Sequence, residues 1–171
     1  MPKISAITQT VRLGLVMVGL LIASNQTSLS QVASNRIYLS LTRNLSPSLF
    51  TIVVSNQSQN VVRIWRLENS WGYDALTVYL QDKDTKQEFS ITRRPREWTV
   101  NAPTYHLIPA RQRQLFAINL TDGWWQIPNE VDLMLKHYRI RIRLSIKETA
   151  ESKQYHVSPM DVFSDWQSSP Y

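Results

Sequence analysis

The chain has 171 residues, a net charge of +6 and no cysteine. This length suits one domain, whose core must hold without disulfides, and the lack of cysteine excludes a thiolate nucleophile, a thiolate metal site and the lipid anchor of a bacterial lipoprotein. The modest basic excess permits an anionic partner without requiring one.

The first residues are typical of an export signal. Lys3 and Arg12 precede an uncharged apolar stretch, Leu13–Ala23, and the polar run after it has small residues at Ser28 and Ser30. At about 1.5 Å a residue, the apolar stretch spans only about half of a roughly 30 Å hydrocarbon core. We therefore expect a signal peptide at 1–30, with an uncleaved N-terminal membrane anchor as the alternative.

Cleavage there would leave a short polar leader, 31–35, and one domain, 36–171. The protein would then be periplasmic or secreted, and the lack of cysteine favours a bacterial host. Two basic residues and no acidic residue would leave with the signal, so the net charge would fall from +6 to +4.

From residue 36 onward, short apolar runs alternate with turn-forming clusters at intervals of about 8 to 12 residues, which is typical of a sandwich or barrel. No helical period is convincing. We predict strands at 37–42, 48–55, 61–67, 76–81, 87–92, 104–108, 114–120 and 138–147, and a closing strand near 156–166.

Alternation of apolar and polar residues is cleanest in three of these strands. The apolar sets are Leu76, Val78 and Leu80; Phe116, Ile118 and Leu120; and Ile140, Ile142, Leu144 and Ile146. Since successive side chains of a strand point to opposite faces, we expect each set to face a core, with Tyr79 and Arg141 pointing outward. The sequence thus predicts an all-β fold, an antiparallel β-sandwich of about eight or nine strands.

No pattern of catalytic, metal or cofactor residues stands out. His106, His137 and His156 occur singly, and Asp82 with Asp84 is better explained as a solvated hairpin turn than as a calcium loop. The chain has no Gly-x-Ser-x-Gly nucleophile motif and no glycine-rich phosphate loop. We therefore expect no enzyme and no cofactor, although a hydrolase site assembled from distant loops stays an alternative.

Aromatic residues gather in the predicted loops. Trp71, Tyr73, Trp98, Trp124 and Trp125 all lie there. Loop residues held on a rigid sandwich commonly form binding surfaces, where tryptophans stack on sugars or anchor a protein partner. The alternative is that these rings are buried as plugs at an end of the sandwich.

Arginine residues form two candidate binding clusters. Arg139, Arg141 and Arg143 alternate with an apolar stripe, so their guanidiniums should project from one face about 7 Å apart. Arg93, Arg94 and Arg96 form a second cluster, beside Trp98. Arginine beside aromatic rings binds anionic polysaccharide, lipid headgroups or nucleic acid, and nucleic acid is not expected for an exported protein.

The strand arginines also have a purely structural interpretation. They could form a ladder of ion pairs with Asp82, Glu88 or Glu148 on neighbouring segments. Such pairs contribute only a few tenths of a kcal/mol each.

Five segments resemble exported bacterial proteins that have an immunoglobulin-like sandwich and no established function. They are Phe50–Asn56, Asn69–Tyr73, Arg93–Trp98, Leu107–Arg111 and Leu120–Trp124. The resemblance covers about residues 50–166, including Tyr138–Arg141 and the closing segment Val162–Trp166, and implies an immunoglobulin-like β-sandwich without implying an activity.

One departure from those sandwiches is the pair Ala110 and Arg111, which stands where they usually have Pro-Gly-Glu or Pro-Gly-Gln, so the turn before Gln114 is expected to differ. A fainter similarity is to the bacterial intracellular proteinase inhibitor family, through an Asn-x-Ser turn and a Leu-x-Pro turn. It implies a loop arginine, Arg94, Arg96 or Arg111, presented to a trypsin-like pocket. The export signal disagrees with that family's compartment.

The resulting expectation is a non-enzymatic exported module, binding or structural, whose partner is a protein or a cell-envelope polymer such as an anionic or neutral polysaccharide. A protease inhibitor is the alternative. Neither interpretation involves nucleic acid, and contact with a membrane is expected only if the N-terminal segment is not cleaved.

Overall fold

A computed structural model describes residues 36–43, 48–99, 101–135 and 137–168. The predicted signal peptide, 1–30, and leader, 31–35, lie outside these residues. Among the described residues, no helix is long and apolar enough to cross a membrane.

The described chain is mostly antiparallel β, as predicted. Its strands are β1 (Ile37–Arg43), β2 (Leu49–Asn56), β3 (Val62–Trp65), β4 (Leu76–Asp82), β5 (Glu88–Arg93), β6 (Tyr105–Ile108), β7 (Arg113–Asn119), β8 (Trp125–Gln126), β9 (Tyr138–Ile146), β10 (Met160–Phe163) and β11 (Gln167–Ser168). A 3-10 turn, η1 (Tyr73–Ala75), precedes β4, and a short helix, α2 (Ala150–Gln154), follows β9. The closing segment therefore differs from expectation, because two short strands, β10 and β11, replace one strand near 156–166.

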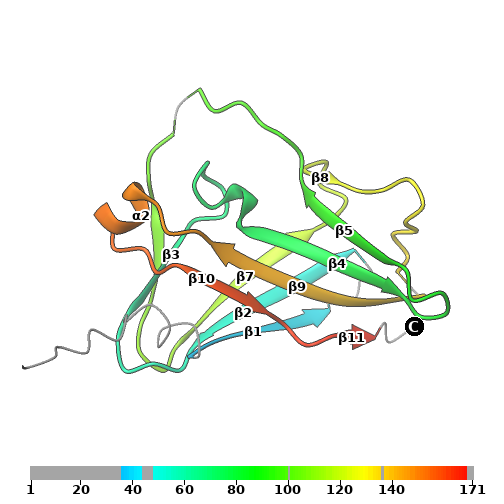
Figure 1. Cartoon of the computed structure of the whole chain (residues 1–171), viewed down its shortest axis with the longest axis horizontal. Coiled ribbons are helices and arrows are strands. Elements are labelled where there is room, and N and C mark those ends of the chain that lie inside the picture. The colour runs from blue at the N-terminus through cyan, green and yellow to red at the C-terminus, as the bar shows by residue number, and fades with distance from the viewer. Residues whose placement is uncertain (1–35, 44–47, 100, 136, 169–171) are drawn as a thin grey trace, which may run out of the picture.

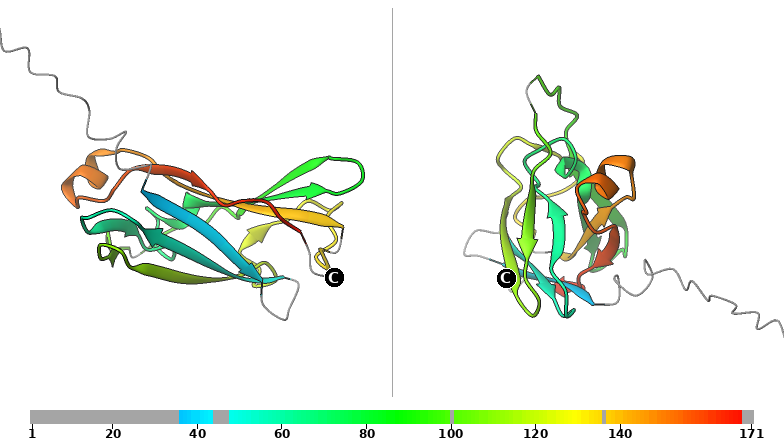
Figure 2. Two further views of the ribbon diagram at one scale, coloured as in Figure 1. Left: turned by 90° about the horizontal axis from the view of Figure 1, so that it is seen from below. Right: turned by 90° about the vertical axis from the view of Figure 1, so that its left-hand side faces the viewer.

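The strands form three antiparallel sheets. The largest has the order β10-β9-β4-β5-β8, with β11 also paired to β9; the second is β1-β2-β7, and the third is the pair β3-β6. Figures 1 and 2 show the large sheet on one side of the molecule and the β1-β2-β7 sheet on the other. Each of these two layers therefore has one face toward the core and one face toward solvent.

The core lies between these layers and follows the alternation of the sequence. All three predicted apolar sets are buried, and β9 alternates buried and half-buried residues along its whole length. Tyr79 and Arg141 lie on the opposite, outer face, as expected from the period of two. The outer face of β9 is therefore the part of the large sheet where charged side chains gather.

Specific hydrogen bonds and one unusual backbone conformation define two turns, the turn after β2 and the turn before β7. Asn56 is completely buried, and its Nδ2 donates to the carbonyls of Asn60, Ile108 and Pro109. In the turn before β7, the N–H of Gln112 donates to the carbonyl of Pro109, and Arg111 has a φ of 62°. Arg111 thus takes the left-handed conformation that favours glycine.

Candidate functional site

The outer face of the large sheet brings three arginines and three aromatic rings together. We call this set the arginine–aromatic face: Tyr79, Arg139, Arg141, Arg143, Phe163 and Trp166. β9 lies between β4 and β10, and register aligns Tyr79 with Arg141 and Phe163 with Arg143. Because paired residues of neighbouring strands share a face, residues distant in sequence meet here.

Arg141 is the centre of this face. Its Cζ lies 4.5 Å from the ring centroid of Phe163, 4.7 Å from that of Trp166 and 5.7 Å from that of Tyr79. Arg139 lies 5.7 Å from the Trp166 centroid, and Arg143 lies 5.5 Å from the Phe163 centroid. Guanidiniums at such distances are attracted to the negative faces of the rings, which also restricts their movement.

The three arginines differ in their charge partners. Arg143 donates from Nε and Nη2 to the two carboxylate oxygens of Asp161, at 2.6 and 2.8 Å. These hydrogen bonds raise the pKa of Arg143 and lower the pKa of Asp161. Among the described residues, no carboxylate lies within 4.0 Å of Arg139 or Arg141. Within the described ranges, the face therefore keeps two arginines that form no ion pair.

The predicted ion-pair ladder is wrong in its partners. Asp82 accepts hydrogen bonds from the backbone of its own turn, and these lower its pKa. Glu88 accepts from Gln81, and Glu148 pairs with Lys153. The carboxylate that does pair with this row, Asp161, comes instead from β10, on the opposite edge of β9 from β4 and β5.

The loop arginines form a second cluster, at the end of β5. Arg96 lies between Trp98 and Trp124, with its Cζ 4.7 and 4.6 Å from their ring centroids. Arg94 is held to the neighbouring segment, where its Nε donates to the carbonyl of Trp125 at 2.9 Å. Trp124 is 43% exposed, so the outer part of this cluster is accessible.

The inner part of the same cluster is a plug. Trp125 is 1% exposed and Tyr73 is 6% exposed, so neither ring can meet a ligand from solution. Arg93 covers them, with its Cζ 4.0 Å from the Trp125 centroid and 5.3 Å from that of Tyr73, and it lies 3.9 Å from Asp122. Burial lowers the pKa of Arg93, and Asp122 partly offsets this effect.

The two predicted roles of the loop aromatics, a binding surface or a buried plug, therefore apply to different residues. Trp125 and Tyr73 are interior, Trp98 and Trp71 are half-buried, and Trp124 faces solvent. The two neighbours differ because Trp125 begins β8 and pairs with Arg93, whereas Trp124 belongs to the preceding turn, where its N–H donates to Oδ1 of Asp122.

Sequence reasoning missed the aromatic half of the arginine–aromatic face. Alternation places Tyr79 outward, but neither Phe163 nor Trp166 has a local signal for its position. Their contact with Arg141 depends on the pairing of β10 and β11 with β9, which local periodicity does not specify.

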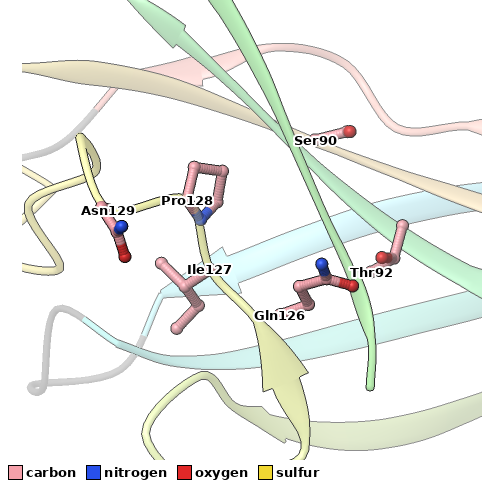
Figure 3. Close-up of a pocket in the computed structure, with 6 residues that line it drawn as sticks. All are labelled: Ser90, Thr92, Gln126, Ile127, Pro128 and Asn129. Atoms are coloured by element: carbon pink, nitrogen blue, oxygen red, sulfur yellow. The ribbon is translucent and has the colours of Figure 1, made fainter. Parts of the chain in front are cut away.

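A separate cavity of about 450 Å³ lies where the chain leaves β8 (Figure 3). Thr92 on β5 pairs with Gln126, the last residue of β8. Pro128 and Asn129 lie on the segment that follows β8. The residues lining this cavity are uncharged, so they offer no acid, base or carboxylate pair. Within the described part of the chain, no group of three histidine, cysteine, aspartate or glutamate residues could hold a metal ion.

Comparison with known proteins adds no family to this description. No protein-family model matches the sequence, and no curated protein matches it significantly. The chemistry of the arginine–aromatic face is therefore the basis for a functional interpretation.

Proposed function

We propose that this domain is a non-enzymatic exported binding module that holds an acidic polysaccharide of the cell envelope against the arginine–aromatic face. The observation that carries the proposal is that Arg139 and Arg141 lie against aromatic rings with no carboxylate of the described chain beside them. Nε of Arg141 is buried, so the donors left for a carboxylate from outside are those of its two Nη groups and those of Arg139.

The geometry of the face suits a linear polymer. Outward side chains two residues apart on a strand are spaced by about 7 Å, so Arg139, Arg141 and Arg143 form a row along β9. Arginine binds carboxylate through paired hydrogen bonds, while the apolar faces of sugar rings can pack on aromatic side chains. Phe163 is 43% exposed and supplies such a surface beside the row.

The architecture supports an immunoglobulin-like sandwich as the scaffold in this proposal. A small sheet, β1-β2-β7, lies opposite a larger antiparallel sheet, and the two bury a shared apolar core. Such scaffolds present rigid strand faces for recognition. Export rests on the N-terminal sequence pattern alone.

The test is binding of polygalacturonate to the purified domain, measured by calorimetry at low and physiological salt. Arg141→Gln removes one charge-assisted contact, worth about 1.5–3 kcal/mol, and is expected to weaken binding about tenfold or more. Arg113→Gln is the matched control, because Arg113 is an exposed arginine on β7 of the opposite sheet. Equal loss in both variants, or no binding by the parent domain at low salt, would contradict the proposal.

The inhibitor alternative gains no support from the loop arginines. A protease pocket requires a side chain that projects freely, whereas Arg94 is bound to the carbonyl of Trp125 and Arg96 is stacked between two tryptophans. Arg111 is exposed in the turn before β7, but the turn is tight.

A further inference from the structure

The row of outward residues on β9 continues past the arginines into a groove. Ser145 and Lys147 follow Arg143 at the same period, and Arg143, Ser145 and Lys147 all line a cavity of about 600 Å³. The opposite wall of this cavity comes from the loop before β4 and from the start of α2. We call it the Trp71 groove, after the aromatic residue in that wall.

Trp71 is held in a fixed position in the groove. The indole ring of Trp71 packs on the buried Trp65, with ring centroids 6.0 Å apart. The backbone N–H of Trp71 donates to Oδ1 of Asn69 at 3.1 Å. Asn69 is itself buried and is tied through Nδ2 to the carbonyl of Thr104 at 2.8 Å. A half-buried tryptophan with this support offers a preformed surface to a ligand.

The polar lining of the groove differs from that of the arginine–aromatic face. It contains the carboxylates of Asp74 and Glu151 and the hydroxyls of Ser70, Thr77 and Thr149. Neither Asp74 nor Glu151 forms an ion pair with a described residue. Arg143 and Lys147 also line the groove, so its two positive and two negative formal charges balance. Since carboxylates accept hydrogen bonds from hydroxyls, a lining without net charge favours a neutral, hydroxyl-rich group packed on Trp71.

The geometry points to a ligand of mixed composition. Resting on the proposed function, we infer that the domain binds a polysaccharide containing both acidic and neutral sugars. Its acidic units lie over Arg139 and Arg141, and a neutral unit packs on Trp71 and donates hydroxyl hydrogen bonds to Asp74 and Glu151. The shared residue Arg143 makes the two subsites continuous along β9.

Two probes separate this inference from the proposed function. Hyaluronan oligosaccharides alternate an acidic with a neutral sugar, whereas oligogalacturonate of similar length has acidic sugars only. The parent domain is expected to bind hyaluronan at least about tenfold more tightly than oligogalacturonate. Trp71→Ala and Asp74→Asn should weaken hyaluronan binding about tenfold and change oligogalacturonate binding less than twofold.

Asp74→Asn preserves the side-chain shape at an exposed position, so its result does not depend on the folding of a tryptophan variant. Trp124→Ala, which removes an exposed tryptophan of the other cluster, is the matched control and should leave both affinities unchanged. Equal affinity for the two probes, with no effect of Trp71→Ala or Asp74→Asn, would overturn the mixed-ligand inference. If Arg141→Gln still weakened the binding of both oligosaccharides, the proposed function would stand despite that result. If neither oligosaccharide bound the parent domain, the mixed-ligand inference and the proposed function would both be overturned.

Discussion

Arg111 holds a backbone conformation that its own side chain disfavours. Its φ is 62°, within a turn closed by the hydrogen bond from Gln112 N–H to the Pro109 carbonyl at 3.1 Å. A residue with a Cβ has a cost of about 1–2 kcal/mol in this region, and glycine avoids it. The turn therefore has a left-handed residue of the kind that favours glycine, although the sequence has arginine there.

We expect Arg111→Gly to increase the free energy of unfolding by about 0.5–1 kcal/mol. The relief of the left-handed strain exceeds the extra chain entropy that glycine loses on folding, about 0.5–1 kcal/mol. Chemical denaturation measures the change, with Arg111→Ala as control, because alanine removes the same charge and retains Cβ. A similar gain in Arg111→Ala would assign the effect to the side chain instead.

The segment between β3 and β4 illustrates how an element depends on one close backbone approach. Gly72 precedes η1, and a Cβ built there would lie 2.2 Å from the Arg66 carbonyl oxygen. The N–H of Gly72 also donates to Oδ1 of Asn69 at 3.0 Å. The whole turn, including Trp71, is therefore positioned by a contact that only glycine permits.

Gly72→Ala should lower the free energy of unfolding by about 2 kcal/mol or more, since relieving the contact requires the backbone to move. Gly123→Ala is the comparison: Gly123 has a φ of 83°, but a Cβ added there would meet no atom within 4 Å, so only the strain of about 1–2 kcal/mol applies. Denaturant titration of both variants checks the ranking. A smaller loss in Gly72→Ala than in Gly123→Ala would refute the argument from the close approach.

α2 is an element that the sequence pattern did not reveal. Thr149 Oγ1 accepts from the N–H of Ser152, and Ser152 Oγ accepts from the N–H of Thr149, so the two side chains form a reciprocal cap. The helix extends only from Ala150 to Gln154, which is too short for a helical period to appear among the apolar residues. Capping, and not amphipathic periodicity, defines it.

At the scale of the whole molecule, His106 lies between two sheets. It belongs to β6, and its ring centroid is 5.1 Å from that of Phe116 on β7. Its Nε2 is buried and has no hydrogen-bond partner among the described residues. Burial first, and then the charge of Arg66, lower the pKa of His106 below its ordinary value of 6.5.

The stability of the domain should therefore depend on pH in the mildly acidic range. Below pH 6.5 the unfolded chain binds a proton that the folded His106 resists, so the free energy of unfolding is highest above 6.5 and falls as the pH decreases toward the folded pKa. His106→Phe should flatten this dependence between about pH 5 and 6.5 in denaturation experiments. An unchanged slope in His106→Phe would exclude His106 as its source.

Asp161 provides the control for that measurement. The hydrogen bonds from Arg143 are the main reason that the pKa of Asp161 is lowered. The contribution of Asp161 to the free energy of unfolding is therefore present above its ordinary pKa of 3.8 and is lost only as the pH falls below that value. Asp161→Asn should accordingly leave the dependence between about pH 5 and 6.5 unchanged.

The sequence by itself determined the direction of side chains along each strand. Because the period of two is local, Leu76, Ile140 and Ile142 could be placed in the core, and Arg141 on the outer face, before any strand was paired. The all-β class and most strand positions followed from the same alternation and from the turn residues between the runs.

Only the tertiary structure decided which of these residues meet. Phe163 and Trp166 reach Arg141 through the pairing of β10 and β11 with β9, and Trp125 is buried beside the exposed Trp124 because β8 pairs with β5. Strand pairing joins segments far apart in the chain and depends on the packing of the whole core, so no local pattern encodes it. The row of arginines was therefore visible in the sequence, whereas its aromatic surroundings and the groove at its end arose from the arrangement of the sheets.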